Sequence, residues 1–491
     1  MSTDRLVVIG GDAAGLSAAA QARRLRPAGD LEIVVLEQGP EVSYSACGIP
    51  YWIGGQVTDR DALLARTVAQ FEADGIVIRT HARAEEIDLA AGEVSASDGR
   101  RYGYDHLVVA TGGRPTRPPV PGLDADGVHG VHRLADGADI RAAIAAGAKR
   151  AVVLGGGYIG LEMAEVLLGR GLSVTVVLAD PLPMGQLDDD MGERICKAMG
   201  DMGIDVQPNQ PVREIEVDAD GAIRAVRTDA GSYDADLVVL GLGMGPEATL
   251  AEEAGLQIGT TGGIDVAHTQ RSRSHPEVFA AGDCAQTFHR ITGEAAHVAL
   301  GTHANKQGRV AGSIIGGRPA RFAGVLGTAA TKVGDLEIAR TGLCTTEAEK
   351  AGYDHRSEVI EATTRAGYYP GAEPIAVKVI TEGGGPGCCS APRSWAGPAA
   401  ASGSTSSPPP SGRGSPPRNW PPPTSPTPRR SHRPTTRWRW RPAWSAGSRP
   451  ADSGLATRPD SPGGAPGGIL IIRYSAVHVL PRSAEHAHRD P

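Results

Sequence analysis

The chain has few cysteines, few aromatic residues and no long hydrophobic segment. Six cysteines at irregular spacing in 491 residues predict reduced thiols and exclude a dense disulfide framework. No apolar run is long enough to cross a bilayer, and no signal peptide precedes the first expected strand at residues 6–9. We therefore expect a cytoplasmic protein without a membrane partner.

Strong net charge is also missing. The formal net charge is −7, so the totals indicate no nucleic-acid partner, and we expect no metal site. Glycine, in contrast, is abundant at 66 residues while aromatics make up only 4% of the chain. Many tight backbone turns in a chain long enough for two or three domains are typical of nucleotide-binding α/β proteins.

A first glycine-rich turn joins an expected strand at 6–9 to an expected helix at 16–25. Its sequence is Gly10-Gly11-Asp12-Ala13-Ala14-Gly15, in which Asp12 replaces the middle glycine of G-x-G-x-x-G. The next strand, 31–36, ends in Glu37, where a carboxylate can accept hydrogen bonds from ribose hydroxyls. Glycines let the backbone approach a pyrophosphate, and the helix N-terminus offers it unpaired N–H groups. We expect Gly10, Gly11, Ala14, Gly15 and Glu37 to bind a dinucleotide.

A second strand–turn–helix unit carries the complete fingerprint. Residues 151–154 form the expected strand, 161–169 the helix and 173–178 the next strand. The turn between them is Gly155-Gly156-Gly157-Tyr158-Ile159-Gly160. Two such turns in one chain indicate two bound dinucleotides. The second is expected to contact Gly155, Gly157, Tyr158, Ile159 and Gly160.

Two further expected strands end in small residues. One ends in Ala110-Thr111-Gly112, and another ends in Gly282-Asp283. An aspartate at the end of a strand in a flavin site can accept hydrogen bonds from ribityl hydroxyls, although taken alone Asp283 would be a plain turn residue. We assign these five residues to the first dinucleotide site.

One cysteine stands in a segment of small residues after the first unit. The segment 43–51 contains Cys47 followed by Gly48 and Pro50. A thiol attacks as the thiolate, which a helix N-terminus or a positive neighbour favours. A two-cysteine C-x4-C site would place a second sulfur at position 52, which is Trp52. If Cys47 is a redox centre it acts alone; the alternative is a buried structural cysteine.

These segments together resemble the pyridine nucleotide-disulfide oxidoreductase family. The resemblance also covers 301–308, 340–343 and 369–371. Within the family the chain is most similar to the single-cysteine branch, the coenzyme A disulfide reductases, to which NADH oxidases and peroxidases are related. The resemblance implies FAD at the first turn, NAD(P)H at the second, and Cys47 as the catalytic thiol beside the flavin.

The implied fold class is α/β, with two Rossmann-like dinucleotide-binding domains and a truncated α+β dimerisation domain. The expected divisions are the first part of an FAD domain at 1–115, an NAD(P) domain at 116–245, the second part of the FAD domain at 246–325, the truncated dimerisation domain at 326–383, and a tail at 384–491.

Several residues bear on the substrate. Arg23, Ser43 and Tyr44 are the expected contacts for coenzyme A disulfide, although Arg23 could equally face solvent from its helix. Ala46 stands where those enzymes often have asparagine, and Ala13 where NADH peroxidases and oxidases carry a histidine. Leu178 occupies the position of a carboxylate that would select NADH, so the sequence leaves NADPH or NADH open.

The tail has a different composition from the rest of the chain. Lys378 is the last lysine, and most prolines and all tryptophans except Trp52 follow residue 384. Dense proline and low hydrophobicity predict disorder. Moving the reading frame back by one base over 389–398 and 424–444 permits sequences close to the family's C-terminal strand and signature. We therefore interpret the tail as a frameshift product that begins near 383–387.

The sequence thus predicts an FAD-dependent NAD(P)H oxidoreductase that reduces coenzyme A disulfide, or a related disulfide or persulfide, through Cys47. The alternatives are an NADH oxidase or peroxidase and a flavin-binding pseudoenzyme. The family is homodimeric, but this frame cannot encode the usual dimer interface, so we expect a monomeric or aggregating chain.

Overall fold

A computed structural model describes residues 3–383 and the backbone of residues 470–476. Its first sheet has the order β18-β7-β1-β2-β3 and is parallel throughout. Apolar runs such as Leu6–Ile9 are buried in this sheet, as a parallel sheet covered on both faces requires. Its strands are β1 (Asp4–Ile9), β2 (Leu31–Leu36), β3 (Val77–Arg79), β7 (His106–Val109) and β18 (Val278–Ala280).

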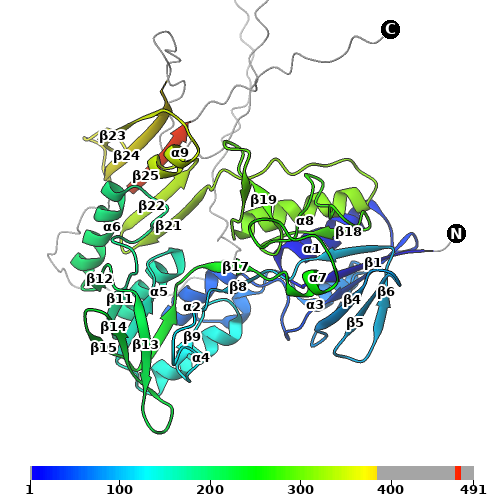
Figure 1. Cartoon of the computed structure of the whole chain (residues 1–491), viewed down its shortest axis with the longest axis horizontal. Coiled ribbons are helices and arrows are strands. Elements are labelled where there is room, and N and C mark those ends of the chain that lie inside the picture. The colour runs from blue at the N-terminus through cyan, green and yellow to red at the C-terminus, as the bar shows by residue number, and fades with distance from the viewer. Residues whose placement is uncertain (1–2, 384–469, 477–491) are drawn as a thin grey trace, which may run out of the picture. The chain divides into compact units, whose positions relative to one another are not determined.

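Two helices lie side by side against this sheet, α1 (Ala13–Leu25) and α8 (Gly301–Ile315), as Figure 1 shows in blue and green. In the sequence, α1 follows the first strand of this sheet, β1, whereas α8 comes after the last one, β18. A Cβ added at Gly308 would lie 2.1 Å from the Ala14 carbonyl oxygen, and one at Gly312 would lie 2.3 Å from that of Ala18. Small residues therefore let the two backbones approach closely and fix the start of α1 beside α8.

The second sheet repeats the parallel arrangement with the order β12-β11-β10-β16-β9. Its core is apolar, and α5 packs on it with Leu161, Met163 and Leu167 fully buried. The strands are β9 (Val128–His129), β10 (Arg150–Leu154), β11 (Ser173–Val177), β12 (Asp205–Gln207) and β16 (Leu237–Leu240); the helices are α4 (Leu134–Ala145), α5 (Tyr158–Gly169) and α6 (Asp189–Met202).

Short antiparallel elements complete these two regions. The chain passes from one parallel sheet to the other and back through a two-stranded pair, β8 (Gly113–Pro115) and β17 (Met244–Pro246). The other short strands are β4 (Ala84–Asp88), β5 (Glu93–Ala96), β6 (Arg101–Gly103), β13 (Val212–Val217), β14 (Ile223–Thr228), β15 (Ser232–Asp234), β19 (Thr287–Phe288) and β20 (Ala295–Ala296). The short helices are α2 (Ile49–Gly54), α3 (Val68–Ala73) and α7 (Thr249–Glu253), and two 3-10 turns span Ala46–Gly48 and Arg60–Leu63.

A third sheet follows residue 328, with the order β21-β22-β25-β24-β23. Four of its strands and one helix are consecutive in the sequence: β21 (Ala329–Val333), β22 (Leu336–Thr341), α9 (Thr345–Lys350), β23 (His355–Thr363) and β24 (Pro374–Glu382). The strands β21 and β22 pair antiparallel, as do β23 and β24. These two hairpins do not pair with each other, because a fifth strand lies between them.

That fifth strand, β25 (Leu470–Ala476), comes from the predicted disordered tail. It pairs in parallel with both β22 and β24 and so occupies the centre of the sheet. The expectation of disorder is therefore wrong for these seven residues. Their sequence, Leu-Ile-Ile-Arg-Tyr-Ser-Ala, is apolar and β-branched at its start, which favours a strand. The expectations for 384–469 and 477–491 lie outside the described residues.

Polar contacts join the third sheet to the helices of the second. The buried Lys378 of β24 places its Nζ 3.1 Å from the Asp188 carboxylate and 2.8 Å from that of Asp190, at the start of α6. The buried Arg340 of β22 donates to the Gln186 carbonyl at 2.5 Å. The third sheet is thus fixed to the second domain of its own chain by paired charges, which would be costly to bury alone.

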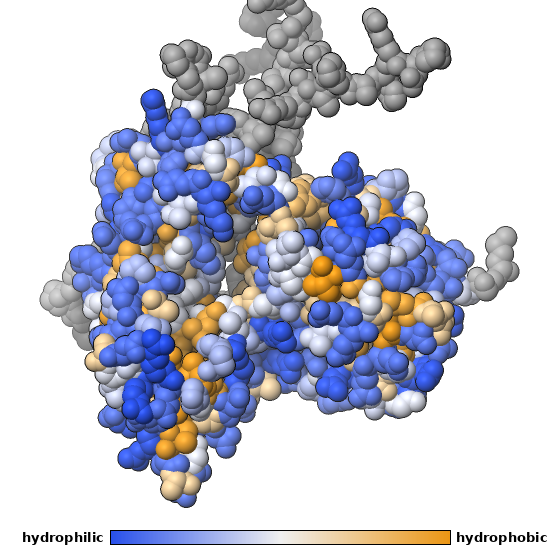
Figure 2. Space-filling view, in the orientation of Figure 1, coloured by the Kyte–Doolittle hydropathy of each residue, from blue (hydrophilic) through white to orange (hydrophobic). Residues whose placement is uncertain are grey.

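The described surface is mostly hydrophilic on the face drawn in Figure 2, with hydrophobic patches between the charged residues. The large apolar or aromatic side chains that it exposes include Ile360 on β23 and Tyr368 and Tyr369 in the loop before β24, the last two at 88% and 57% exposure. No helix in the described part of the chain is long and apolar enough to cross a membrane. The predicted α/β fold class, with two Rossmann-like parallel sheets and a third sheet of mixed strand pairing, is confirmed.

The central position of β25 gives a first test. We expect Ile472→Pro to weaken the third sheet, because proline removes a backbone donor from a strand that is paired on both sides. Hydrogen exchange of the β24 amides should accelerate about tenfold or more. Ser453→Pro, placed before the strand, is the control and should change nothing. Equal protection of the β24 amides in wild type and in both variants would show that β25 is not part of the sheet.

Candidate functional site

The carboxyl ends of four parallel strands meet along one edge of the first sheet. In the order β18-β7-β1-β2, these ends carry Asp283, Ala110–Gly112, the first glycine turn and Glu37. Segments that are up to about 270 residues apart in the sequence are thereby brought to a single edge, because parallel strands all end on the same side. The structure therefore gathers all the residues that the sequence assigned to the first dinucleotide site.

Close backbone contacts shape the first turn. Gly10 has a φ of +107°, and a Cβ there would lie 2.1 Å from the Ala110 carbonyl oxygen. A Cβ at Gly15 would lie 2.0 Å from the Gly10 carbonyl oxygen and 2.9 Å from the Val8 side chain. Gly15 is thus needed for the contact between helix and strand, rather than for direct approach to a pyrophosphate. Without it α1 could not start at this distance from β1.

Glu37 is held by the turn that it faces. Its Oε2 accepts a hydrogen bond from the Gly11 N–H at 2.8 Å, and its Oε1 accepts from the Gly39 N–H at 2.7 Å. The carboxylate is therefore fixed beside the glycine turn at the end of β2. This position suits an acceptor for the hydroxyls of a ribose.

Asp283 lies at the opposite end of the same edge, directly after the positive-φ Gly282. Burial raises the pKa of its carboxyl, and no described residue donates a hydrogen bond to that carboxylate. A half-buried carboxylate that accepts no hydrogen bond from the described protein suits a ligand whose hydroxyl groups can donate hydrogen bonds to it. The edge as a whole therefore fits an extended dinucleotide with a polyol or ribose at each end.

Asp12 is the feature of this edge that the sequence presented only as a departure from the fingerprint. It precedes α1, and its side chain makes no capping hydrogen bond to the helix. Burial, together with the nearby charges of Glu37 and Asp283, raises its pKa from 3.8 to about 7. A protonated Asp12 adds no negative charge beside a pyrophosphate, so the substitution remains compatible with a dinucleotide.

The second glycine turn repeats this geometry at the end of β10. Gly155 has a φ of +96°, and a Cβ at Gly160 would lie 2.1 Å from the Gly155 carbonyl oxygen. Tyr158 and Ile159 begin α5 and remain partly exposed, beside the turn formed by Gly155 and Gly157. Leu178, after β11, is buried. This edge of the second sheet therefore fits a second dinucleotide. Leu178 stands at the position where an NADH-specific protein would have a carboxylate for the ribose.

Cys47 lies in the 3-10 turn Ala46–Gly48 that leads directly into α2. This segment is attached to the first domain, because the Ser43 N–H donates to the Gly11 carbonyl at 2.9 Å and the Ser45 N–H donates to the Leu63 carbonyl at 2.8 Å. Ser43 itself has a positive φ of 54°. Cys47 is an exposed residue, although the protein around it partly desolvates its thiol. It is therefore held next to the first glycine turn and open to a ligand.

The charges around Cys47 are negative. Desolvation and the Glu162 carboxylate raise the pKa of its thiol, with smaller contributions in the same direction from Asp12 and Asp283. The positive neighbour that would favour a thiolate is not among the groups found to act on it within the described chain. Glu162 belongs to α5, which packs on α2. Sequence reasoning missed it, because it lies in no motif and is 115 positions from Cys47.

Trp52, which occupies the position of a second cysteine, is part of the packed protein interior. Trp52 is buried, and the Arg141 guanidinium lies 5.1 Å from its ring centroid and donates to its carbonyl at 2.5 Å. Cys284, the cysteine beside Asp283, is also buried and donates to the Val109 carbonyl at 3.4 Å. Both belong to the protein interior, in agreement with a thiol at position 47 that acts alone.

The residues expected to contact the substrate differ in their surroundings. Tyr44 is half-buried, and its hydroxyl donates to the His132 carbonyl at 3.5 Å. Arg23 lies toward the far end of α1 from the glycine turn and donates to the Arg26 carbonyl at 3.1 Å and to the Gly75 carbonyl at 2.9 Å. Its guanidinium is therefore used in holding the loop after α3, which the sequence did not predict.

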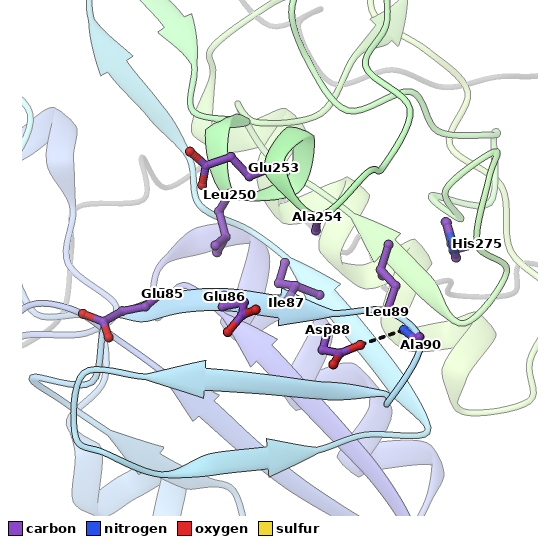
Figure 3. Close-up of a pocket in the computed structure, with 10 residues that line it drawn as sticks. All are labelled: Glu85, Glu86, Ile87, Asp88, Leu89, Ala90, Leu250, Glu253, Ala254 and His275. Atoms are coloured by element: carbon purple, nitrogen blue, oxygen red, sulfur yellow. Dashed lines mark hydrogen bonds between the residues drawn. The ribbon is translucent and has the colours of Figure 1, made fainter.

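A separate hollow of about 540 Å³ lies between β4 and α7. Figure 3 shows Ile87 and Leu250 pointing into it, with acidic residues from both elements around them. Asp88 uses its Oδ1 to accept from the Ala90 N–H at 3.0 Å. None of the residues assigned to either dinucleotide site lines this hollow, so it is not part of the candidate site.

Comparisons with known proteins agree with this geometry. Residues 4–308 match the pyridine nucleotide-disulphide oxidoreductase family, and the chain belongs to that family. It is 39% identical over 390 residues to an NAD(P)H sulfur oxidoreductase (CoA-dependent) of Pyrococcus abyssi, covering 77% of this chain and 84% of that protein. It is 38% identical over 383 residues to an NADH oxidase of Methanocaldococcus jannaschii, covering 77% and 84%.

A solved structure is similar as well. The NAD-dependent persulfide reductase from A. fulgidus superposes with a TM-score of 0.75 at 38% identity, covering 77% of this chain and 72% of that one. The chain is accordingly a flavoprotein oxidoreductase that uses FAD and NAD(P)H. The residues present fit both cofactors, through two turns in which a side chain at Gly10, Gly15, Gly155 or Gly160 would collide with the backbone, and through the half-buried carboxylate of Asp283.

The two glycine turns can be separated by mutation. We expect Gly15→Val to abolish flavin retention, because its Cβ collides with the Gly10 carbonyl and displaces α1 from the turn. Gly160→Val should keep flavin and weaken NAD(P)H binding, through the matching collision with Gly155. Gly29→Val, which meets nothing within 4 Å, is the control. Flavin absorbance of the purified proteins and NAD(P)H titration measure the outcome; loss of NAD(P)H alone in both variants would contradict the assignment.

The raised pKa of Asp12 predicts a pH-dependent stability. Its folded-state pKa of about 7 lies above the ordinary 3.8, so the stability contributed by the neutral carboxyl is lost as the pH rises through about 7. Flavin-free Asp12→Asn should therefore melt at a higher temperature than wild type at pH 8, with the difference shrinking toward pH 5. Asp30→Asn, at an exposed position, is the control. A difference that stays constant with pH would refute the assignment.

Proposed function

We propose that this protein reduces coenzyme A disulfide, or a related coenzyme A persulfide, with electrons from NAD(P)H and with Cys47 as the reacting thiol. One observation carries the proposal: an exposed thiol is held beside the first glycine turn, while the position of a second sulfur is filled by buried Trp52. The P. abyssi protein is named a CoA-dependent NAD(P)H sulfur oxidoreductase and the A. fulgidus protein an NAD-dependent persulfide reductase, and these names support the substrate class.

In this proposal FAD occupies the edge of the first sheet, and NAD(P)H the edge of the second. Gly10, Gly11 and Ala14 bind the FAD pyrophosphate at the start of α1, where Gly15 keeps the helix close to β1. Glu37 accepts from the ribose of FAD, and Asp283 accepts from its ribityl chain. Ala110, Thr111, Gly112 and Gly282 line the same edge. Thr111 is oriented by its hydrogen bond to the Glu247 carbonyl at 2.5 Å. The bound flavin supplies transfer of an electron pair from the nicotinamide to sulfur.

The chemistry of the chain itself is that of one sulfur. The Cys47 thiolate attacks one sulfur of the disulfide, so that an S–S bond forms at Cys47 and one coenzyme A thiol leaves with a proton. Two electrons and a second proton then cleave the new bond, restore Cys47 and release the second thiol. For a persulfide the second product is hydrogen sulfide. NAD(P)H supplies the two electrons in either case, so atoms and charge balance.

Ser43 and Tyr44 are the proposed substrate contacts, because both belong to the segment that carries Cys47 and Tyr44 is only half-buried. Arg23 remains a candidate for a coenzyme A phosphate only if it leaves its contacts with Gly75 and Arg26. Ala13, in place of a first-turn histidine, argues against peroxide or oxygen as the main substrate.

We also propose that the family sequence ends near residue 383 in this chain. The P. abyssi relative matches over 77% of the chain, which supports a loss of similarity near that point. Reading the DNA around codons 380–390 tests the frameshift directly. Because the family dimer depends on the missing segment, turnover by the chain as written is expected to be slow, and its usual dimer is not expected to form.

The role of Cys47 has a direct test. Cys47→Ser should keep bound flavin and lower coenzyme A disulfide reduction to below about 1% of wild type, since Cys47 is the exposed one among the cysteines that the structure describes. Cys196→Ser, on the outer part of α6, is the matched control and should retain activity. Undiminished disulfide reduction by Cys47→Ser would remove Cys47 from the mechanism. Oxygen consumption measured in parallel separates an oxidase, and a bound flavin that NAD(P)H cannot reduce would identify a pseudoenzyme.

A further inference from the structure

Two residues of the third sheet contact α5, the helix that packs on α2 directly after Cys47. Thr331, on β21, donates its Oγ1 hydrogen to the Glu162 carboxylate of α5 at 3.0 Å. The next residue, Lys332, places its Nζ 3.0 Å from Glu165, one helical turn further along α5. The first strand of the dimerisation domain thus contacts two carboxylates on one face of a helix in the NAD(P) domain.

Glu162 in turn acts on the residues around the thiol. It is the leading charged neighbour of both Cys47 and Tyr51, the latter on α2. Glu162 is only partly exposed, and burial raises the pKa of its carboxyl while the Thr331 hydroxyl opposes that rise. A hydrogen bond to a carboxylate stabilises the charged form. The charge next to Cys47 therefore depends on whether the Thr331 hydroxyl is in place.

We propose that Thr331 is a positioning residue that fixes the Glu162 carboxylate on α5, the helix that packs on α2 directly after Cys47, so that the first strand of the third sheet controls the reactivity of the thiol. The negative charge favours the thiol form in the resting protein and restrains unspecific reaction. The inference rests on the proposed role of Cys47 as the reacting sulfur. Its test, however, measures the thiol itself and needs no turnover.

Other charged groups act on the same residues and have to stay unchanged in the test. Asp12 and Asp283 belong to the edge of the first sheet and also raise the pKa of Cys47, and Tyr51 lies on α2, directly after the turn that carries Cys47. Glu165 and Lys332 act on Glu162 with opposite signs. None of these groups is altered by removing one hydroxyl from Thr331, so a change at Cys47 in that variant reports on the contact between Thr331 and Glu162.

The experiment is a double-mutant cycle on the flavin-loaded protein. The rate of iodoacetamide alkylation of Cys47 is measured against pH, with the modified peptide identified by mass spectrometry. Glu162→Gln should raise the rate near neutral pH by about threefold or more, because a neighbouring negative charge is gone. Thr331→Val should raise it in the same direction by less, and should add nothing in the Glu162→Gln background.

Two further variants separate positioning from a loss of structure. Thr331→Ser keeps the hydroxyl and should restore the wild-type profile. Thr328→Val removes a threonine hydroxyl that bonds to Thr341 at 2.7 Å in the same domain, and should leave the profile unchanged. The proposal is overturned if Thr331→Val leaves the profile as in wild type, or if it has the same effect with and without Glu162. Failure of Cys47→Ser to abolish disulfide reduction would instead overturn the proposed function.

Discussion

The contact between the Gly10 carbonyl and the Cα of Gly15 is the constraint on which the candidate site depends. It sets how close α1 can start to β1, and a Cβ at Gly15 would reduce the distance to 2.0 Å. The packing of α8 on α1 then depends on the same small residues, since Gly308 meets the Ala14 carbonyl. A sheet edge with room for a dinucleotide exists because these backbones touch, and the second domain reproduces the arrangement with Gly155 and Gly160.

The electrostatics of the site are dominated by carboxylates. Asp12, Glu37 and Asp283 lie in or beside the first turn, and the charge of Glu162, from the second domain, raises the pKa of the Cys47 thiol. This field opposes ionisation of Cys47, whereas nucleophilic attack requires the thiolate. If Cys47 reacts as proposed, the local charge has to change before its thiolate forms. The proposed reactivity of Cys47 then depends on both dinucleotide domains and on the third sheet.

Much of the site could be predicted from the sequence, because its residues lie directly after strands. Gly10–Gly15, Gly155–Gly160 and Asp283 are recognisable by spacing, and parallel strands must bring their ends together. Glu162 and Thr331 could not be predicted, since each is an ordinary residue of a helix or a strand and their contact spans 169 positions. The packing contacts of Arg23 also depended on a loop 52 positions away. Sequence patterns report local geometry, whereas these contacts follow from how the domains meet.

The strand β25 has a consequence for the order of folding. The two hairpins β21–β22 and β23–β24 are each local in the sequence and can form as soon as they are synthesised. Their union into one sheet requires Leu470–Ala476, which pairs with Glu337–Thr341 at a separation of more than 130 residues. Such long-range pairing is slow, because the ends of a long loop must meet first. During translation the dinucleotide domains can therefore be complete while the third sheet is still open at its centre, until Leu470–Ala476 has been synthesised.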